Sequence, residues 1–81
     1  MNNRFDIEFL ETSTEVLRAM AHPIRLAVVD VLKDGQKLSV TEIHELLNIE
    51  QAVASHHLRI LKDKSILNAR RKGKNTFYSL R

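Results

Sequence analysis

The sequence of 81 residues has no cysteine, no tryptophan, a single proline and two glycines. Without cysteine it can form neither disulfide bonds nor thiolate metal sites. A chain of this length provides one domain, which we expect to span residues 1–81, and such small domains bury a modest share of their surface. Helix packing or association with a second subunit must therefore supply the stability that disulfides supply elsewhere.

Long apolar runs are also missing, because no stretch approaches the about 20 residues that a membrane-spanning helix needs. The segment from Met1 to Glu8 mixes acidic and apolar side chains, and it lacks the basic start and apolar stretch of a secretory signal. The share of charged residues, 28%, is that of an ordinary globular domain. These features predict a cytoplasmic protein that makes no use of a membrane.

Acidic and basic residues are unevenly distributed along the chain. Residues 1–50 contain five lysines and arginines against nine acidic residues, a net charge of −4. Residues 51–81 contain eight lysines and arginines against one acidic residue, Asp63, a net charge of +7. A basic segment of this density is typical of a surface that contacts nucleic-acid phosphates.

Apolar residues at helical spacing predict four helices. The first covers about residues 4–20, and the second begins at Pro23, which suits the first position of a helix. The third follows a capping box formed by Ser39-Val40-Thr41-Glu42. The fourth covers residues 51–63, after a turn of three residues that starts at Asn48. Asparagine tolerates the left-handed conformation that such a sharp turn requires.

After Ser65 the apolar spacing changes to every second residue, which predicts two strands, Ile66–Arg71 and Thr76–Leu80. The predicted fold class is therefore mainly α with a small β-hairpin, in which four helices precede two strands. The side chains expected to face inward are Leu67, Ala69, Tyr78 and Leu80.

The fourth helix has an apolar arc and a polar arc when its residues are projected at 100° steps. The apolar arc also contains His57. The polar arc contains no acidic residue and comprises Gln51, Ala52, Ser55, His56, Arg59 and Lys62. Amide and guanidinium groups can pair with base edges in the DNA major groove, and small residues allow close approach. Alternatively, this arc is only the solvated side of an amphipathic helix.

The hairpin provides a second basic element, whose cations are Arg70, Arg71, Lys72 and Lys74. A cationic hairpin can lie along the phosphate backbone or enter the minor groove, where negative potential is high. Lysines on edge strands also discourage aggregation, which explains some of these residues but not a segment of net charge +7. The two elements together predict double-stranded DNA as the partner.

These segments resemble the ArsR-type winged helix-turn-helix transcriptional regulators. The resemblance is carried, in order and at the family's separations, by Leu17–Leu26, Ser55–Leu61, Arg70–Lys74 and Tyr78–Leu80. It implies a winged helix-turn-helix fold and a sequence-specific DNA-binding regulator, a repressor. Residues 51–63 would be the recognition helix in the major groove, and residues 70–75 the wing on the backbone or minor groove.

The same resemblance assigns roles to single residues. Gln51, Ala52, Ser55, His56 and Arg59 would face the major groove. Arg71, Lys72 and Lys74 would serve the wing, whereas His57 and Tyr78 would be mainly structural. The sequence departs from the family at two positions, and both substitutions are tolerable: Ser65 stands where the family usually has glycine, and Glu50 where a serine-like cap is usual.

We expect neither a metal site nor a cofactor. Some family members sense metals through cysteines at the start of the third helix, where this sequence has Ser39–His44. Others use a carboxylate and histidine set on a C-terminal helix, and this sequence ends at Arg81, after the last wing strand. The four histidines are not expected to cluster: His22, His44, His56 and His57.

We also expect no enzymatic activity and no catalytic residues, because the adjacent Ser55 and His56 cannot form a nucleophile and base pair. The expected assembly is a homodimer through the N-terminal helix, which is rich in apolar residues: Phe5, Ile7, Phe9 and Leu10. Alternatively, these residues close the core of the monomer. A different hypothesis is a winged-helix protein-protein interaction module whose basic face binds an acidic partner.

Overall fold

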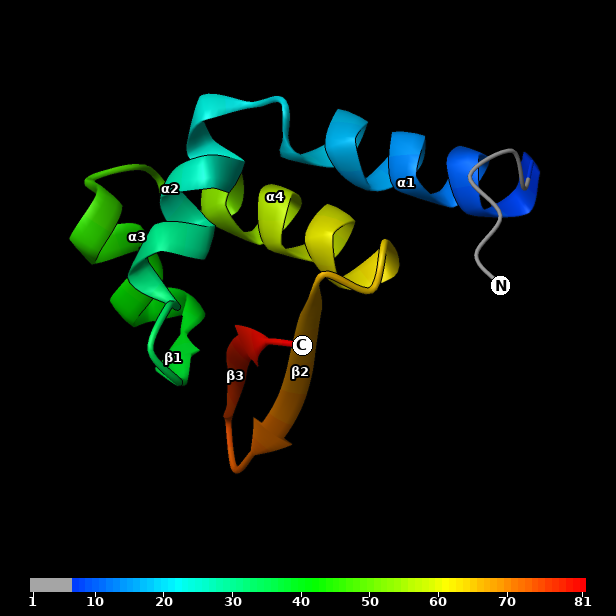
Figure 1. Ribbon diagram of the computed structural model, residues 1–81. Coiled ribbons are helices and arrows are strands. Elements are labelled where there is room, and N and C mark those ends of the chain that lie inside the picture. Colours follow the sequence, from blue (N-terminus) through cyan, green and yellow to red (C-terminus); the bar gives the residue numbers. More distant parts are fainter. Residues whose placement is uncertain (1–6) are drawn as a thin grey trace.

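The computed structural model describes the backbone of residues 7–81 and the side chains of residues 14–81. Its elements are α1 (Ile7–Met20), α2 (Pro23–Val31), β1 (Leu38–Ser39), α3 (Val40–Leu47), α4 (Gln51–Asp63), β2 (Leu67–Lys72) and β3 (Asn75–Leu80). In Figure 1, α2, α3 and α4 lie together, α1 extends to one side, and the hairpin β2–β3 points away from the helices. The four predicted helices are confirmed, and none in the described residues is long and apolar enough to cross a membrane.

Helices α2 and α3 start where the sequence predicts, at Pro23 and after the Ser39 capping box. Pro23 occupies the first turn of α2, and Nδ1 of His22 accepts the Ile24 N–H at 3.2 Å. At α3, the Glu42 N–H donates to Ser39 Oγ at 3.1 Å, and the Ser39 N–H donates to Glu42 Oε1 at 2.9 Å. This reciprocal pair satisfies two backbone donors that a helix start leaves without partners, and it confirms the capping box.

Two residues with left-handed backbone flank α4. Asn48 has φ 54° and ψ 48°, which lets the chain turn sharply between α3 and α4, as predicted. Ser65 follows α4 with φ 62°. A non-glycine residue in this conformation costs about 1–2 kcal/mol, which gives the physical reason why glycine is favoured at such a position. The chain therefore retains the helix-turn-helix geometry at some cost in stability.

The sheet contains three antiparallel strands in the order β1-β3-β2. The sequence predicts the hairpin but not β1, which pairs Leu38 with Tyr78 and Ser39 with Phe77. Ser39 therefore both pairs in the sheet and caps α3, and this fixes the start of the helix-turn-helix to the wing sheet.

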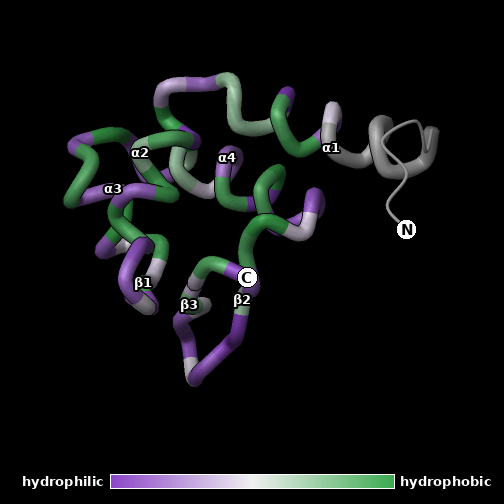
Figure 2. Tube along the Cα trace, in the orientation of Figure 1, coloured by the Kyte–Doolittle hydropathy of each residue, from purple (hydrophilic) through white to green (hydrophobic). Residues whose placement is uncertain are grey.

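The core is formed by residues from both the acidic and the basic part of the chain. Within residues 14–81, the six largest fully buried side chains are Val28, Leu32, Ile43, Leu58, Leu61 and Leu67. Burial of such a side chain contributes about 1.5–3 kcal/mol. Figure 2 shows hydrophobic residues on the helices and hydrophilic ones towards the hairpin tip. Tyr78 and Leu80 pack against this core as predicted, and burial raises the pKa of the Tyr78 phenol.

Two leucines differ from the amphipathic pattern. Helical spacing places Leu17 and Leu46 on the apolar faces of their helices, but these side chains are 71% and 62% exposed. Spacing shows which residues share a face of a helix, but it does not show whether another element covers that face.

Candidate nucleic-acid interface

The two sides of α4 have the predicted character. The side that packs against the other elements buries Ala54, His57, Leu58 and Leu61. All six residues of the predicted polar arc are exposed: Gln51, Ala52, Ser55, His56, Arg59 and Lys62. The helix is thus anchored by a mainly apolar side and presents amide, hydroxyl, imidazole and cationic groups on the other.

Polar contacts also hold α4 to the preceding helices. Arg25, on α2, donates from Nε to Nδ1 of His57 at 3.1 Å and from Nη1 to the carbonyl oxygen of Ala19 at 3.0 Å. The His22 ring lies against His57 with a centroid separation of 4.4 Å. At the other end of α4, Lys64 Nζ is 3.5 Å from Glu15 Oε1 on α1. This ion pair is exposed and contributes little to the stability of the fold.

The environment of His57 disfavours its charged form. His57 is 6% exposed, and burial is the largest cause that lowers the pKa of its imidazole below the ordinary value of 6.5. The nearby His22, Arg25 and His56 lower this pKa further. His57 is therefore a neutral hydrogen-bond acceptor near neutral pH, in agreement with a structural role.

The histidines lie closer together than the sequence predicts. The ring centroid of His57 is 5.2 Å from that of His56 and 4.4 Å from that of His22. The sequence did not predict the contact between His22 and His57, because it depends on how the start of α2 packs against α4. Within residues 14–81, however, no group of three or more His, Cys, Asp or Glu is arranged to hold a metal ion.

The cations of the wing are exposed but lie on two faces of the hairpin. Register pairs Arg71 with Thr76 on the face that carries Leu67 and Ala69, which point towards the helices. Arg70 and Lys72 alternate onto the opposite, outer face. The structure therefore does not bring all four predicted wing cations onto one surface.

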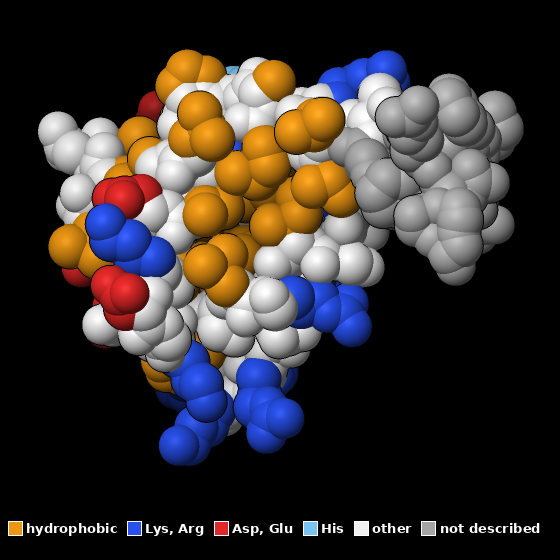
Figure 3. All heavy atoms as spheres, viewed as in Figure 1, with side chains coloured by type: hydrophobic (Ala, Val, Ile, Leu, Met, Phe, Trp, Pro, Cys, Tyr) orange, Lys and Arg blue, Asp and Glu red, His pale blue; other side chains and the backbone are white. Residues whose placement is uncertain are grey.

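The tip of the hairpin is a two-residue turn, Gly73-Lys74, in which Gly73 has φ 64°. This positive φ suits the tight turn types that match the twist of a hairpin. Arg71 Nε donates to the carbonyl oxygen of Gly73 at 3.2 Å, which orients its guanidinium along the tip. Figure 3 shows lysine and arginine side chains gathered at this end of the molecule.

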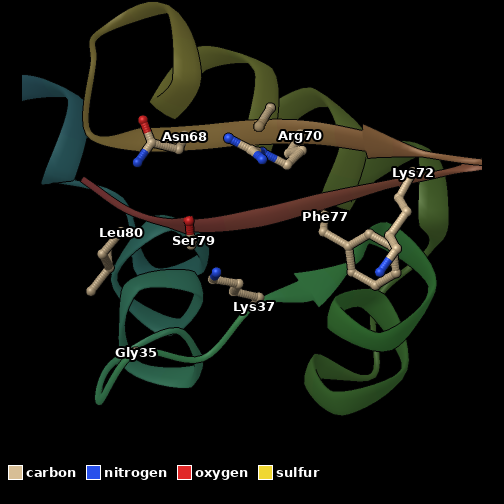
Figure 4. Close-up of a pocket in the computed structure, with 9 residues that line it drawn as sticks. Gly35, Lys37, Asn68, Arg70, Lys72, Phe77, Ser79 and Leu80 are labelled. Carbon is tan, nitrogen blue, oxygen red and sulfur yellow. The ribbon is translucent and has the colours of Figure 1, made fainter.

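A shallow groove of about 1040 Å³ runs along the outer face of the sheet (Figure 4). Its lining comprises Gly35, Lys37, Asn68, Ala69, Arg70, Lys72, Phe77, Ser79 and Leu80. The sequence analysis did not select Lys37, because this residue belongs to the half of the chain with a net charge of −4. The fold places it in the lining of the same groove as Arg70 and Lys72, and this lining contains no acidic residue.

Comparison with known sequences identifies several related regulators. A family profile described as a helix-turn-helix domain matches residues 20–69. The repressor SmtB of Mycobacterium tuberculosis is 37% identical over 73 residues, which cover 90% of this chain and 53% of SmtB. The repressor PagR of Bacillus anthracis is 34% identical over 80 residues, which cover 99% of this chain and 80% of PagR. The chain thus spans about half the length of SmtB and most of the length of PagR.

Solved structures agree with these matches. The crystal structure of Bacillus anthracis PagR superposes with a TM-score of 0.85 at 36% identity, covering 94% of this chain and 86% of PagR. A solution structure from Mycobacterium bovis gives a TM-score of 0.85 at 26% identity, covering 98% of this chain and 72% of the other. That protein is a homodimeric winged helix-turn-helix DNA-binding domain from a possible ArsR-family transcriptional regulator.

Proposed function

Because the chain belongs to the ArsR family of winged helix-turn-helix regulators, which are not enzymes, we propose that it represses transcription from a specific double-stranded DNA site. The observation that carries this proposal is the exposed side of α4. The six residues there either carry hydrogen-bonding groups or are small enough to let the helix approach DNA closely, and none of them is acidic. An anchored helix with such a surface has the chemistry that base edges in the major groove require.

The residues proposed to contact DNA fall into two groups. In the major groove these are Gln51, Ala52, Ser55, His56, Arg59 and Lys62. On the wing they are Arg70, Arg71, Lys72 and Lys74. Because the register places Arg70 and Lys72 on the outer face, we expect Arg71 and Lys74 to reach the same duplex as α4 most directly. Phosphate contacts by the wing would add affinity without sequence preference.

We propose that the protein acts as a homodimer through α1. Leu17 on this helix is 71% exposed, and Figure 3 shows hydrophobic side chains gathered on the face below α1. The Mycobacterium bovis relative is described as homodimeric, which supports the same assembly here. Phe5 lies outside the described residues, as do the side chains of Ile7, Phe9 and Leu10. Two copies would place their α4 helices in successive major grooves, about 10 base pairs apart.

We further propose that residues 1–81 act as one DNA-binding domain in the cytoplasm. The single domain is supported by the core that Val28 and Leu67 share, because such a core leaves no independent unit between these residues. The cytoplasmic location is supported by the proposed DNA target.

The test is selection of duplexes from a random pool, followed by measurement of affinity at rising salt. We expect one two-fold symmetric sequence to be enriched. Because each phosphate contact releases counterions, log affinity should fall by about 0.9 per contact for each tenfold rise in salt. Failure to bind any duplex at low salt would refute the proposal and would favour the acidic protein partner.

A further inference from the structure

Arg25 connects three helices at one point. It lies on α2, and its guanidinium donates to the Ala19 carbonyl near the end of α1 and to the His57 ring on α4. A planar guanidinium holds two such acceptors in fixed directions, which a lysine ammonium does not. The position of α4 relative to α1 is therefore set by a single side chain as well as by the apolar core.

The direction of the hydrogen bond fixes the protonation state of His57. A guanidinium has donors only, so Nδ1 of His57 must be without a proton to accept from Arg25. When the imidazole takes up a second proton, both ring nitrogens become donors. The 3.1 Å contact would then join two donors and two positive charges, and it would break.

Among the side chains of residues 14–81, no neighbouring charge compensates for this. Within that range, the groups whose charges act on His57 are His22 at the start of α2, Arg25 on α2 and His56 on α4. Each of them, when charged, opposes protonation of His57, and burial acts in the same direction and more strongly. His44 on α3 is engaged elsewhere, with its Nδ1 3.1 Å from the carbonyl oxygen of Ile49.

We propose that Arg25 and His57 are positioning residues for the recognition helix, and that their link holds only while His57 is neutral. Protonation of His57 releases α4 from the end of α1 and weakens DNA binding. This inference rests on the proposed function, because it assumes that α4 reads DNA. It adds a loss of DNA affinity at low pH, caused by a buried residue on the inner side of α4.

The expected sign distinguishes His57 from the exposed surface of α4. A positive charge added to the surface proposed to face DNA would strengthen binding. Protonation of His57 would instead weaken binding at low pH. The contribution of His57 is therefore isolated by variants of His57 itself.

A matched pair of variants isolates it. In His57→Asn the amide oxygen can take the place of Nδ1 and accept from Arg25, whereas in His57→Gln the amide lies one bond further out. Neither side chain titrates. Asparagine is the poorer helix former, so helix propensity alone would make His57→Asn the weaker binder. We expect the reverse: at pH 8, His57→Asn should bind the selected duplex as the unmodified protein does, and His57→Gln should bind more weakly.

The pH profile is the decisive readout. Between pH 8 and pH 5.5 the affinity of the unmodified protein should fall relative to that of His57→Asn, because only the unmodified protein can take up a proton at position 57. Identical profiles for these two proteins, or equal affinity of the Asn and Gln variants at pH 8, would overturn the inference. Absence of duplex binding by the unmodified protein at pH 8 would instead refute the proposed function.

Two measurements without DNA keep the inference testable if a variant folds poorly. Nitrogen chemical shifts of the unmodified protein should identify His57 as the neutral form with its proton on Nε2. The pH dependence of the free energy of unfolding should also show that His57 is neutral in the folded protein. Because folding lowers the pKa of His57 from 6.5, the neutral form stabilises the fold above that pH, and this contribution is lost as pH falls below about 6.5. A charged His57, or a proton on Nδ1, at pH 7 would overturn the link to Arg25.

Discussion

Residues 1–50 and residues 51–81 share the buried core but contribute oppositely to the charge. Among the side chains of residues 14–81, three of the six largest that are fully buried come from each region. Their net charges, by contrast, are −4 and +7. Stability is thus a property of both regions together, whereas the proposed affinity for DNA belongs almost entirely to the second. Substitutions that separate these two properties test this comparison.

The largest expected effect concerns the shared core. Leu58→Ala on α4 should lower the free energy of unfolding by about 2–5 kcal/mol, because it removes a fully buried side chain and leaves a cavity. Leu32→Ala, in the acidic region, should cost a similar amount. Urea unfolding measures both, with exposed Lys62→Ala as a control that stays within about 0.5 kcal/mol. A small loss for Leu32→Ala alone would mean that the regions do not share one core.

The next effect concerns the basic region and leaves the fold intact. Arg59→Ala should weaken binding to the selected duplex by about 1–3 kcal/mol and random duplexes much less, if this guanidinium pairs with a base. Lys74→Ala, at the hairpin tip, should weaken all duplexes alike and reduce the salt slope by about 0.9. Titration of both variants with selected and random duplexes measures these losses of affinity. Equal losses on both duplexes for both variants would contradict this division between base and phosphate contacts.

Sequence patterns were sufficient to predict α4 and the hairpin, because each follows from its own apolar spacing and basic residues. The same reasoning missed β1, which has two residues and no pattern of its own. It also missed the contact between Arg25 and His57, since this contact depends on how α2 crosses α4. The net charge of a sequence region also does not show where each of its residues lies in the fold. Lys37 belongs to the acidic region, but it lines the groove on the outer face of the basic hairpin.

A smaller effect is expected where the two regions meet. Ser39 caps α3 in the acidic region and pairs with Phe77 of β3 in the basic one. Ser39→Ala should cost about 1 kcal/mol through loss of the cap, because the backbone pairing with β3 can persist. Ser39→Asp keeps a capping acceptor and should retain most of the stability, which thermal unfolding will show. Equal losses for both variants would mean that packing at this site, and not the cap, determines its contribution.

The smallest effect is expected for the removal of a positive charge that lies outside the basic region. Lys33, in the acidic region, forms an ion pair with Asp30 at 3.1 Å, and both side chains are more than 60% exposed. Lys33→Ala should therefore change the free energy of unfolding by at most about 1 kcal/mol. It removes the same charge as Lys74→Ala, yet DNA affinity and salt slope should not change, because exposed charges beyond about 10 Å are screened at 0.1 M salt. If both substitutions weaken DNA binding equally, affinity depends on the net charge of +3 and not on its concentration in residues 51–81.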